Sequence, residues 1–330
     1  MSEHNVTVAV DAMGGDRAPK EIVEGALDAA RQLGIGVLLV GREDLVGPLL
    51  PRDVAGVELV AASDVVEMDE AATAVRSKKD ASIVRCAQLV RDGRAQALVS
   101  AGNTGATMAA ALLRIGRIRG VARPAIAAPI PVPGHRPQVL LDAGSTVDCA
   151  PEWLVQFAVM GREYARIRLD VDEPRIGLLS NGEEAGKGDD LRKHVFPLLA
   201  DVPGFVGNVE GRDFMRPGVD VVVTDGFTGN VALKTLEGGI RGTAALVLGV
   251  LDDPELHDAA SALMPHFLEA ATLVDPDYVG GAVLLGVAGV CVVGHGSSSA
   301  LAIVHAVRQA VECVEAGVVE RTKEAIGDAR

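Results

Sequence analysis

Six short apolar runs along this chain each end in a loop rich in Gly, Asn, Asp and Ser, and a helix-like stretch rich in Ala and Leu follows each loop. A strand, loop and helix in this order place backbone N–H groups at a helix start, where they attract anions. Any single loop of this kind is also what a tight turn or a helix cap requires. In an open parallel sheet, however, such loops gather along one edge, so six of them predict one shared polar crevice. The six units begin at Ala9, Val99, Leu140, Leu178, Val222 and Val292.

The apolar runs are continuous rather than alternating, which indicates strands buried on both faces. Hydrophobic residues make up 48% of the 330 residues and aromatics only 3%, so Ala, Val, Leu and Ile must form the core. We expect a single α/β domain over residues 1–330, with a mostly parallel sheet covered by helices on both faces. Strands are expected at 6–10, 37–40, 57–60, 97–100, 139–141, 176–179, 219–224 and 287–293.

The segment 244–277 differs from the rest of the chain. Apolar residues recur there at helical spacing, and Pro265 is not expected inside an unbroken helix. We expect two short amphipathic helices hinged near Pro265, forming an arm. Its apolar face fits ordinary core, a dimer contact or a membrane-surface patch. Core or a dimer contact is favoured, because the polar face is acidic and anionic lipid would repel it. The apolar residues are Leu256, Ala260, Leu263, Met264, Phe267 and Ala271.

Charge, apolar stretches and cysteine spacing argue against a nucleic-acid-binding, secreted, membrane-spanning or metal-binding protein. The net charge of −14 argues against nucleic-acid binding, which needs a basic face. The N-terminal MSEHN shows no signal peptide, and the apolar stretch Val283–Val293 has about half the length of a membrane span. We therefore expect a cytoplasmic protein without a metal site. Its four cysteines, scattered without C-x-x-C spacing, suit a reducing compartment; they are Cys86, Cys149, Cys291 and Cys313.

Two motifs nearly fit nucleotide sites. Gly182–Gly188 resembles a phosphate-binding P-loop but is one residue short and lacks the Ser or Thr after Lys187. The GHGSSS stretch at Gly294 resembles a dinucleotide fingerprint but has Ser299 in place of its third glycine. No cofactor is therefore expected. Cys149 is a candidate acyl-accepting nucleophile, but an inert packing role is favoured for a lone cysteine.

Three loops offer the best chemistry: Ser100–Ala106, Asn181–Gly188 and Asp225–Asn230. Each combines glycines with amide or hydroxyl donors, and one adds a lysine, which suits a compact oxyanion such as phosphate. Four aspartates are expected to end strands at the same edge, where they orient these donors or cap helices. The donors are Asn103, Thr104, Lys187, Thr228 and Asn230; the aspartates are Asp11, Asp16, Asp142 and Asp225.

Several long segments resemble the bacterial phosphate acyltransferase family, the PlsX-type enzymes of phospholipid synthesis. They occur in order from about Val8 to Val311: AVDAMGGDRAP, MDEAATAVRSKKDAS, VSAGNTGA, GLLSNGEEAGKG, GNVEGRD, VTDGFTGNVALKTLEG and VVGHGSSSALAI. The resemblance implies a three-layer α/β/α fold similar to phosphate acetyltransferases and isocitrate-type dehydrogenases. It also implies conversion of acyl-[acyl-carrier protein] and inorganic phosphate into acyl phosphate and free carrier. Family members work as homodimers at the inner face of the membrane and pass acyl phosphate to a membrane glycerol-3-phosphate acyltransferase.

Two stretches depart from the family pattern. The chain has GST at Gly144–Thr146 where the family commonly has GAN, which questions an amide role for that loop. It has Val283 where the family has proline in GGAPLLG, which is expected to alter the crevice wall or the arm.

Phosphate is already largely ionised near neutral pH, and a thiol leaves readily, so direct attack on a thioester needs positioned donors rather than a strong base. We expect Lys187 and the loop at Asn103 to bind phosphate, Asn230 to face the oxyanion, and His295 to assist the departing thiol; capping or bracing its loop suits His295 equally well. Further phosphate-binding candidates are Asp11, Gly14, Gly15, Gly102, Thr104, Gly105, Asn181, Gly186, Asp225, Thr228 and Gly229.

Acyl carrier proteins are acidic, so a docking patch must be basic despite the overall charge. One candidate patch lies in LRIGRIRGVAR and comprises Arg114, Arg117, Arg119 and Arg123; the competing patch is Arg76, Lys78 and Lys79. A charge cluster of this kind is also compatible with a plain solvated face.

Three alternatives stay open. The enzyme could use acyl-coenzyme A as its donor, or the chain could be a non-catalytic scaffold that binds acyl carrier protein. A dehydrogenase on the related fold is the third, and it predicts binding of a nicotinamide cofactor.

Overall fold

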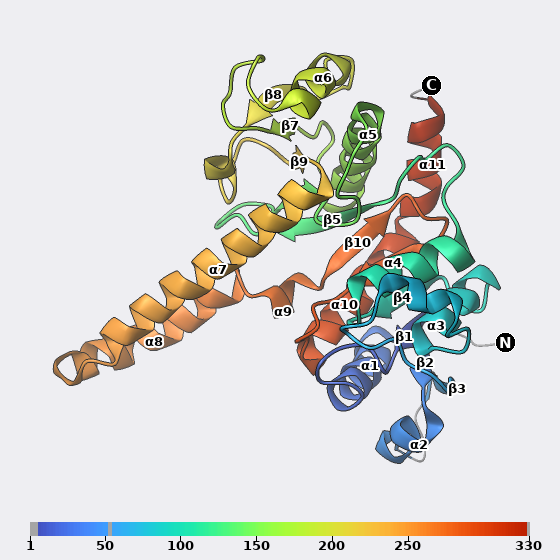
Figure 1. Ribbon diagram of the computed structural model, residues 1–330. Helices are drawn as coiled ribbons and strands as arrows, with labels where there is room; N and C mark the ends of the chain where they lie inside the picture. Colours follow the sequence, from blue (N-terminus) through green and yellow to red (C-terminus); the bar gives the residue numbers. More distant parts are fainter. Residues whose placement is uncertain (1–5, 52–54, 329–330) are drawn as a thin grey trace.

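One sheet runs through the computed structural model, which describes residues 6–51 and 55–328 (Figure 1). The MSEHN segment, from which no signal peptide is expected, lies outside the described residues. From one edge of the sheet to the other, the strands are β3 (Val57–Ala61), β2 (Gly36–Gly41), β1 (Thr7–Asp11), β4 (Ala97–Ser100), β11 (Val290–Val293), β10 (Ala282–Leu285), β5 (Ala125–Ile130), β6 (Gln138–Leu141), β9 (Val221–Val223), β7 (Ile176–Leu179) and β8 (Phe205–Val209).

The strands of this sheet point in two directions. β10 is antiparallel to β11 and to β5, and β5 is antiparallel to β6, whereas the other pairs are parallel. A mostly parallel sheet is therefore confirmed. The expectation that all six loops share one edge is wrong, because the loops after β1, β4 and β11 lie at one edge and those after β6, β7 and β9 at the opposite edge. The reversal occurs at β5 and β10, which the apolar runs did not predict as separate strands.

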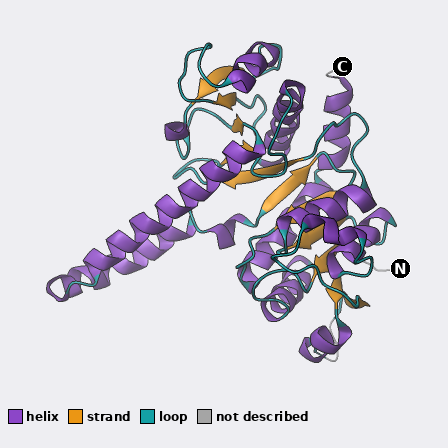
Figure 2. Cartoon of the chain, viewed as in Figure 1, coloured by secondary structure: helices purple, strands orange, loops and turns teal. Residues whose placement is uncertain are grey.

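Helices cover both faces of the sheet and complete the expected three layers (Figure 2). Alternate strand residues divide between the two cores: Val8 and Val10 face one, and Ala9 faces the other. The first core is closed by α1 (Lys20–Leu33), α5 (Pro151–Arg168), α6 (Asp190–Leu199), α10 (Ala300–Glu315) and α11 (Val318–Asp328); α3 (Ser82–Arg91) and α4 (Thr104–Ala110) close the second, and α2 (Glu43–Val46) follows β2.

The Val283 departure lies inside the sheet rather than on a crevice wall. Val283 is 2% exposed in β10, where it pairs with Ala127 of β5 and Val292 of β11. A valine suits this place because β10 is an interior strand, with β11 on one side and β5 on the other, and the side chain is buried in the core.

A helical arm projects from the body of the molecule (Figure 1). It consists of α7 (Gly226–Leu251) and α8 (His257–Thr272), and the short α9 (Pro276–Val279) leads back to the sheet. The expected hinge at Pro265 is wrong, because α8 continues through this residue and the chain turns at 252–256 instead. The carbonyl of Ser261, which Pro265 leaves without its usual donor, belongs to an exposed residue and remains open to water.

The outer face of the arm is apolar and exposed, so an ordinary core role is wrong for its large side chains. Leu246 is 75% exposed. Ala260 and Phe267 lie on the other side of α8, where Ala260 is buried and Phe267 lines a groove against α7. The further exposed apolar residues are Val250, Leu263, Leu268 and Leu273.

Within the described ranges, no helix combines the length and apolar character that a membrane span requires. The same residues contain no group of three or more His, Cys, Asp or Glu side chains placed to hold a metal ion.

Candidate functional site

Three loops pack backbone to backbone where β1, β4 and β11 end. We call residues 11–16, 100–106 and 294–299 the amide-rich loops. Gly294 N–H donates to the carbonyl of Ser100 at 2.8 Å, and Asp16 N–H donates to the carbonyl of Gly296 at 2.8 Å. A Cβ atom on Gly14 would lie 2.8 Å from the backbone nitrogen of Gly102. The approach is too close for any side chain at Gly14, which explains the glycine there.

The buried carboxyl group of Asp11 holds these loops through hydrogen bonds. Asp11 is 3% exposed and accepts a hydrogen bond from Ser100 Oγ at 2.8 Å. Ser100 Oγ in turn accepts from Gly102 N–H at 3.1 Å, and Asp11 Oδ1 accepts from Met13 N–H at 3.3 Å. Burial raises the pKa of Asp11, although hydrogen bonds from Ser82 and Ser100 partly oppose the rise. Asp11 therefore fixes the loops from inside and does not face solvent.

The amide-rich loops carry backbone donors without partners. The N–H groups of Gly15, Thr104, Gly105 and Gly296 make no hydrogen bond within the part of the chain that the structure describes. All four residues are at least partly accessible. Free N–H groups that converge at loop and helix starts bind anions. This edge of the sheet is therefore suited to hold phosphate or a developing oxyanion.

The side chain of Asn103 braces this site. Its Oδ1 accepts from Ala106 N–H at 3.0 Å and caps α4. Its Nδ2 donates to the carbonyls of Met68 and Glu70 at 3.0 and 2.8 Å. Because these contacts occupy the amide, the phosphate contact predicted at this loop falls to its backbone N–H groups.

His295 lies in the third amide-rich loop and is exposed. Its Nδ1 lies 2.8 Å from Ser297 Oγ, while its carbonyl accepts from Ser298 Oγ at 2.6 Å. The backbone of His295 thus braces the loop, and its imidazole remains open to a substrate. The bracing role agrees with the bond from Ser298, and assistance to the departing thiol stays a prediction.

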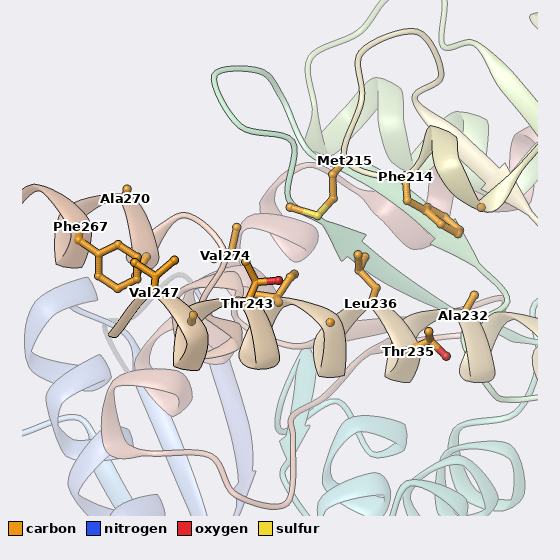
Figure 3. A pocket seen from close by; sticks show the side chains of 15 residues that line it. Phe214, Met215, Ala232, Thr235, Leu236, Thr243, Val247, Phe267, Ala270 and Val274 are labelled. Atoms are coloured by element: carbon orange, nitrogen blue, oxygen red, sulfur yellow. The ribbon is translucent and has the colours of Figure 1, made fainter. Parts of the chain in front are cut away.

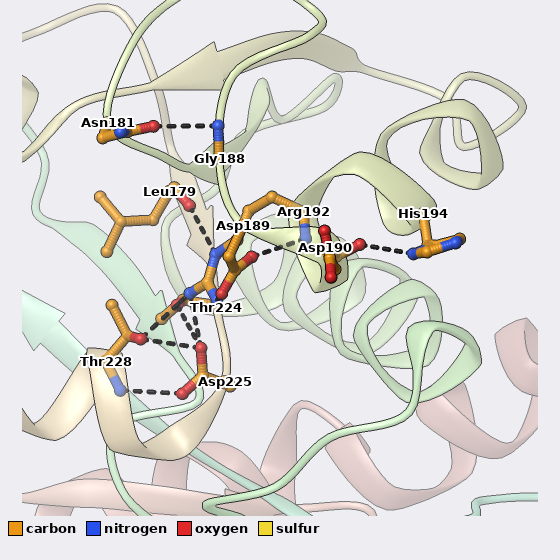
Figure 4. Close-up of polar contacts among 10 residues, drawn as sticks. All are labelled: Leu179, Asn181, Gly188, Asp189, Asp190, Arg192, His194, Thr224, Asp225 and Thr228. Carbon is orange, nitrogen blue, oxygen red and sulfur yellow. Dashed lines mark hydrogen bonds and ion pairs between the residues drawn. The ribbon is translucent and has the colours of Figure 1, made fainter.

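The other three loops form a network around a buried arginine. We call residues 142–146, 180–192 and 224–230 the arginine-centred loops. Arg192 donates from Nη2 to Thr224 Oγ1 at 2.7 Å, from Nη1 to Asp189 at 2.9 Å and from Nε to the carbonyl of Leu179 at 3.2 Å, and it forms an ion pair with Asp225 (Figure 4). Sequence reasoning missed Arg192. The sequence does offer Asp189 as a helix cap three residues before Arg192, but a cap does not indicate that the arginine side chain is buried.

Aspartates accept hydrogen bonds from several donors of the arginine-centred loops. Asp225 accepts from Thr228 N–H at 2.9 Å and Thr228 Oγ1 at 2.8 Å. Burial favours a higher pKa for Asp225, but the Thr228 hydrogen bonds and the charge of Arg192 outweigh it and lower this pKa. Asp142 is fully buried and accepts from the N–H groups of Ser145 and Thr146, although burial still raises its pKa. The GST departure therefore serves a structural turn around Asp142.

Lys187 and Asn230 lie on the arginine-centred loops with free polar ends. Both are exposed, and neither side-chain nitrogen makes a hydrogen bond or ion pair within the described residues. The stem of Lys187 rests on Gly182, where a Cβ would lie 2.8 Å from Lys187 Cγ. Asn181 accepts from Gly188 N–H at 2.9 Å and shapes this loop.

The predicted catalytic residues therefore divide between two edges. Asn103 and His295 belong to the amide-rich loops, and Lys187 and Asn230 to the arginine-centred loops. No hydrogen bond or ion pair among the described residues joins the two sets. Binding of one phosphate by Lys187 together with the loop at Asn103 therefore stays a prediction. Gly229 has a packing reason, since its Cβ would lie 1.9 Å from the carbonyl of Asp142, whereas Gly186 is open to solvent.

The basic patch after α4 is largely free of internal partners. Arg114, Arg117, Arg119 and Arg123 make no ion pair with a described carboxylate. Arg123 lies over the ring of Trp153 at 4.8 Å, and Arg117 donates to the carbonyl of Ala122. In the competing patch, Lys78 is occupied by Glu70 at 2.7 Å and the carbonyl of Val65 at 2.6 Å, while Arg76 and Lys79 are exposed.

Cys149 is unsuited to nucleophilic attack. Burial raises its pKa to about 12, and its Sγ lies 3.3 Å from the carbonyl of Thr146. The thiol is therefore protonated at neutral pH, in agreement with the packing role favoured from the sequence.

An apolar groove of about 710 Å³ runs along the arm (Figure 3). Side chains of α7 and α8, including Leu236, Val247 and Phe267, line it together with Phe214 and Met215 from the loop after β8. A second cavity of about 600 Å³ lies beside Gln138, with Arg136 and Arg216 in its wall.

Comparisons with known proteins agree with the motifs. A family model described as fatty acid synthesis protein matches residues 6–321. The phosphate acyltransferase of Leptospira biflexa is 45% identical over 97% of each chain. Two solved structures share the fold. A phosphotransacetylase from Streptococcus pyogenes is 18% identical, with a TM-score of 0.60, and the match covers 96% of this chain and 94% of that one. A branched-chain phosphotransacylase from Enterococcus faecalis is 17% identical, with a TM-score of 0.60, and the match covers 94% of this chain and 99% of that one. The α/β/α fold and the resemblance are thereby confirmed, and the chain belongs to the phosphate acyltransferase family of fatty acid synthesis proteins.

Proposed function

We propose that this chain transfers the acyl group of an acyl-[acyl-carrier protein] to inorganic phosphate. The observation that carries the proposal is the set of free N–H donors on Gly15, Thr104, Gly105 and Gly296, held in place by close backbone packing. Preorganised donors of this kind stabilise charge as it develops in a transition state.

The proposed reaction is a direct displacement. A phosphate oxygen attacks the thioester carbonyl carbon, the carbonyl oxygen becomes an oxyanion, and the carbon–sulfur bond then breaks. The products are acyl phosphate and the carrier thiolate, which takes up a proton. An ordinary thiol has a pKa of about 8.5, so the thiolate leaves without a strong acid. Positioning and oxyanion stabilisation are then the main requirements.

The amide-rich loops are the proposed reaction site. Their N–H groups would hold phosphate and the oxyanion, and the exposed imidazole of His295 would protonate the departing thiolate. Lys187 and Asn230, whose side-chain nitrogens are exposed and unpaired among the described residues, are proposed as further phosphate and oxyanion ligands.

Docking of the carrier is proposed at Arg114 and Arg119. Ten residue steps along α4 and the π-helical turn after it (Ala111–Ile115) separate Thr104 from Arg114, or about 15 Å at most. A carrier docked there would have to extend its acyl group along α4 to the amide-rich loops. We further propose a homodimer through the apolar arm, peripheral attachment to the membrane, and transfer of the product to a membrane glycerol-3-phosphate acyltransferase.

Release of free carrier thiol from a long-chain acyl-carrier protein, measured with and without phosphate, tests the function. Phosphate-dependent release, with the acyl phosphate trapped by hydroxylamine, is the expected result. Phosphate-independent release would indicate hydrolysis, and carrier binding without release would indicate a scaffold. Parallel reactions with acyl-coenzyme A establish which donor is preferred.

A further inference from the structure

The root of the arm is bonded directly to an amide-rich loop. Ser299, the last residue of the 294–299 loop, donates from Oγ to Asp277 Oδ2 at 2.5 Å. Asp277 lies in α9, which links α8 of the arm to the sheet. Ser299 is also the N-cap of α10, where its Oγ accepts from Ala302 N–H at 3.3 Å. One hydroxyl group thus connects the arm, the loop and the helix.

Close packing holds the same segment against α10 and β11. A Cβ on Gly280 would lie 2.8 Å from the carbonyl of His305, and one on Gly281 would lie 2.7 Å from the carbonyl of Val293. The rings of Tyr278 and His305 lie 5.6 Å apart. Both glycines have positive φ values, 87° and 98°, so the chain reaches this contact by a turn that favours glycine. The link from the arm to the loop is therefore short and sterically defined.

The loop end fixed by Asp277 carries one of the free donors. Gly296 lies three residues before Ser299, and its carbonyl accepts from Asp16 N–H at 2.8 Å in the first amide-rich loop. On the other side of Ser299, Glu21 Oε2 accepts from Ala300 N–H at 2.9 Å. Glu21 belongs to α1 in the body, whereas Asp277 belongs to the segment that leads back from the arm.

We infer that Asp277 is a positioning residue that holds the 294–299 loop in its anion-binding form and ties that loop to the arm. Asp277 does not touch phosphate; it acts through Ser299. The inference deepens the proposed function, on which its kinetic test rests.

Amide hydrogen exchange over residues 294–302 measures how firmly Asp277 holds this loop, and it does so independently of any enzyme activity. Asp277→Ala removes the hydrogen bond from Ser299 to a carboxylate. We therefore expect the backbone N–H groups of this loop to exchange roughly ten-fold faster in the variant. Asp277→Asn retains an oxygen acceptor and should restore slow exchange. Asp258→Ala is the matched control, since it removes an exposed carboxylate in the first turn of α8. Ser299→Ala removes the same bond from the loop side, and Asp277→Ala/Ser299→Ala should be no worse than Ser299→Ala alone.

Kinetics supply the second readout. Asp277→Ala should raise KM for phosphate roughly ten-fold with kcat nearly unchanged, and Asp277→Asn should restore it. Unchanged exchange and KM in Asp277→Ala, equal loss in Asp277→Asn, or additive effects in the double variant would each overturn the inference. If the unaltered protein shows no phosphate-dependent thiol release, the proposed function fails, while the exchange experiment still judges the link.

Discussion

The ion pair between Arg192 and Asp225 is buried, with each side chain only 7% exposed. It joins α6 to Asp225, the N-cap of α7, and so links the segments that follow β7 and β9 (Figure 4). A buried charge that loses its partner is left without solvation, and this asymmetry makes the pair a sensitive structural test.

Asp225→Ala should lower the free energy of unfolding by about 3 kcal/mol, because it leaves the Arg192 guanidinium buried without its carboxylate partner. Urea denaturation at neutral pH measures the loss. Asp189→Ala removes an exposed partner of the same arginine and should cost much less. Equal losses in the two variants would contradict the importance assigned to the buried pair.

The same pair predicts a dependence on acid. The pKa of Asp225 is lower in the folded state than in the unfolded chain, so its contribution to stability is present above the unfolded pKa of about 3.9 and is lost as pH falls through the folded pKa. The stability difference between the unaltered protein and Asp225→Asn should therefore shrink below about pH 4. A difference that stays constant from pH 7 to pH 3 would exclude this linkage.

Gly14→Ala should abolish most activity while leaving the fold in place. The new Cβ would lie 2.7 Å from Asp11 Oδ2 and 2.8 Å from Gly102 N, and a shift of about 1 Å in a reaction site can cost roughly 100-fold in rate. Thiol release and circular dichroism measure the two effects. Gly47→Ala is the control, since a Cβ there meets nothing within 4 Å; similar activity in both variants would remove the amide-rich loops from the reaction site.

Lys187→Ala should raise KM for phosphate, with a smaller effect on kcat, because the free ammonium group is proposed to bind the anion. A loss of one charge-assisted hydrogen bond corresponds to roughly a ten-fold change. Lys193→Ala, on the nearby helix α6, is a suitable control. An unchanged KM in Lys187→Ala would leave phosphate binding to the amide-rich loops alone.

Charge reversal in the patch after α4 should weaken carrier binding. The double variant Arg114→Glu/Arg119→Glu should raise Kd about five-fold at low salt, and the difference should shrink as salt increases. Titration of acyl-carrier protein at two salt concentrations measures it. Arg91→Glu reverses an exposed charge on α3 and should have little effect; if it weakens binding equally, the effect is one of net charge rather than of docking.

The layers could be predicted from sequence, but the reversal of strand direction could not. Val37–Val40, Ala97–Ser100 and Ile176–Leu179 are continuous apolar runs, and each is a buried strand. Ala125–Ile130 contains Pro129, which weakens its strand signal. Ala282–Leu285 follows two glycines and merges into the longer apolar stretch before β11. Without β5 and β10, the predicted sheet has one direction and therefore one loop-bearing edge.

The candidate site shows the same limit. The glycines and polar residues of the amide-rich loops could be predicted, because close approach and free N–H groups require those residue types. The burial of Arg192 could not, since it depends on Thr224 and Asp225, which lie between β9 and α7 and more than 30 residues along the chain. Likewise, the sequence predicts Asn103 as a ligand because it cannot show that the carbonyls of Met68 and Glu70 accept from its side-chain amide.

The unbroken course of α7 has a mechanical consequence. Its 26 residues span about 39 Å, from Asn230 near one end to the exposed leucines and valines of the arm near the other. A helix resists compression along its axis because each turn is bonded to the next. If a second molecule contacts the outer end of α7, a shift there would be transmitted along this stiff helix to Asn230. The proposed assembly through the arm would then influence the position of a side chain far from its own interface.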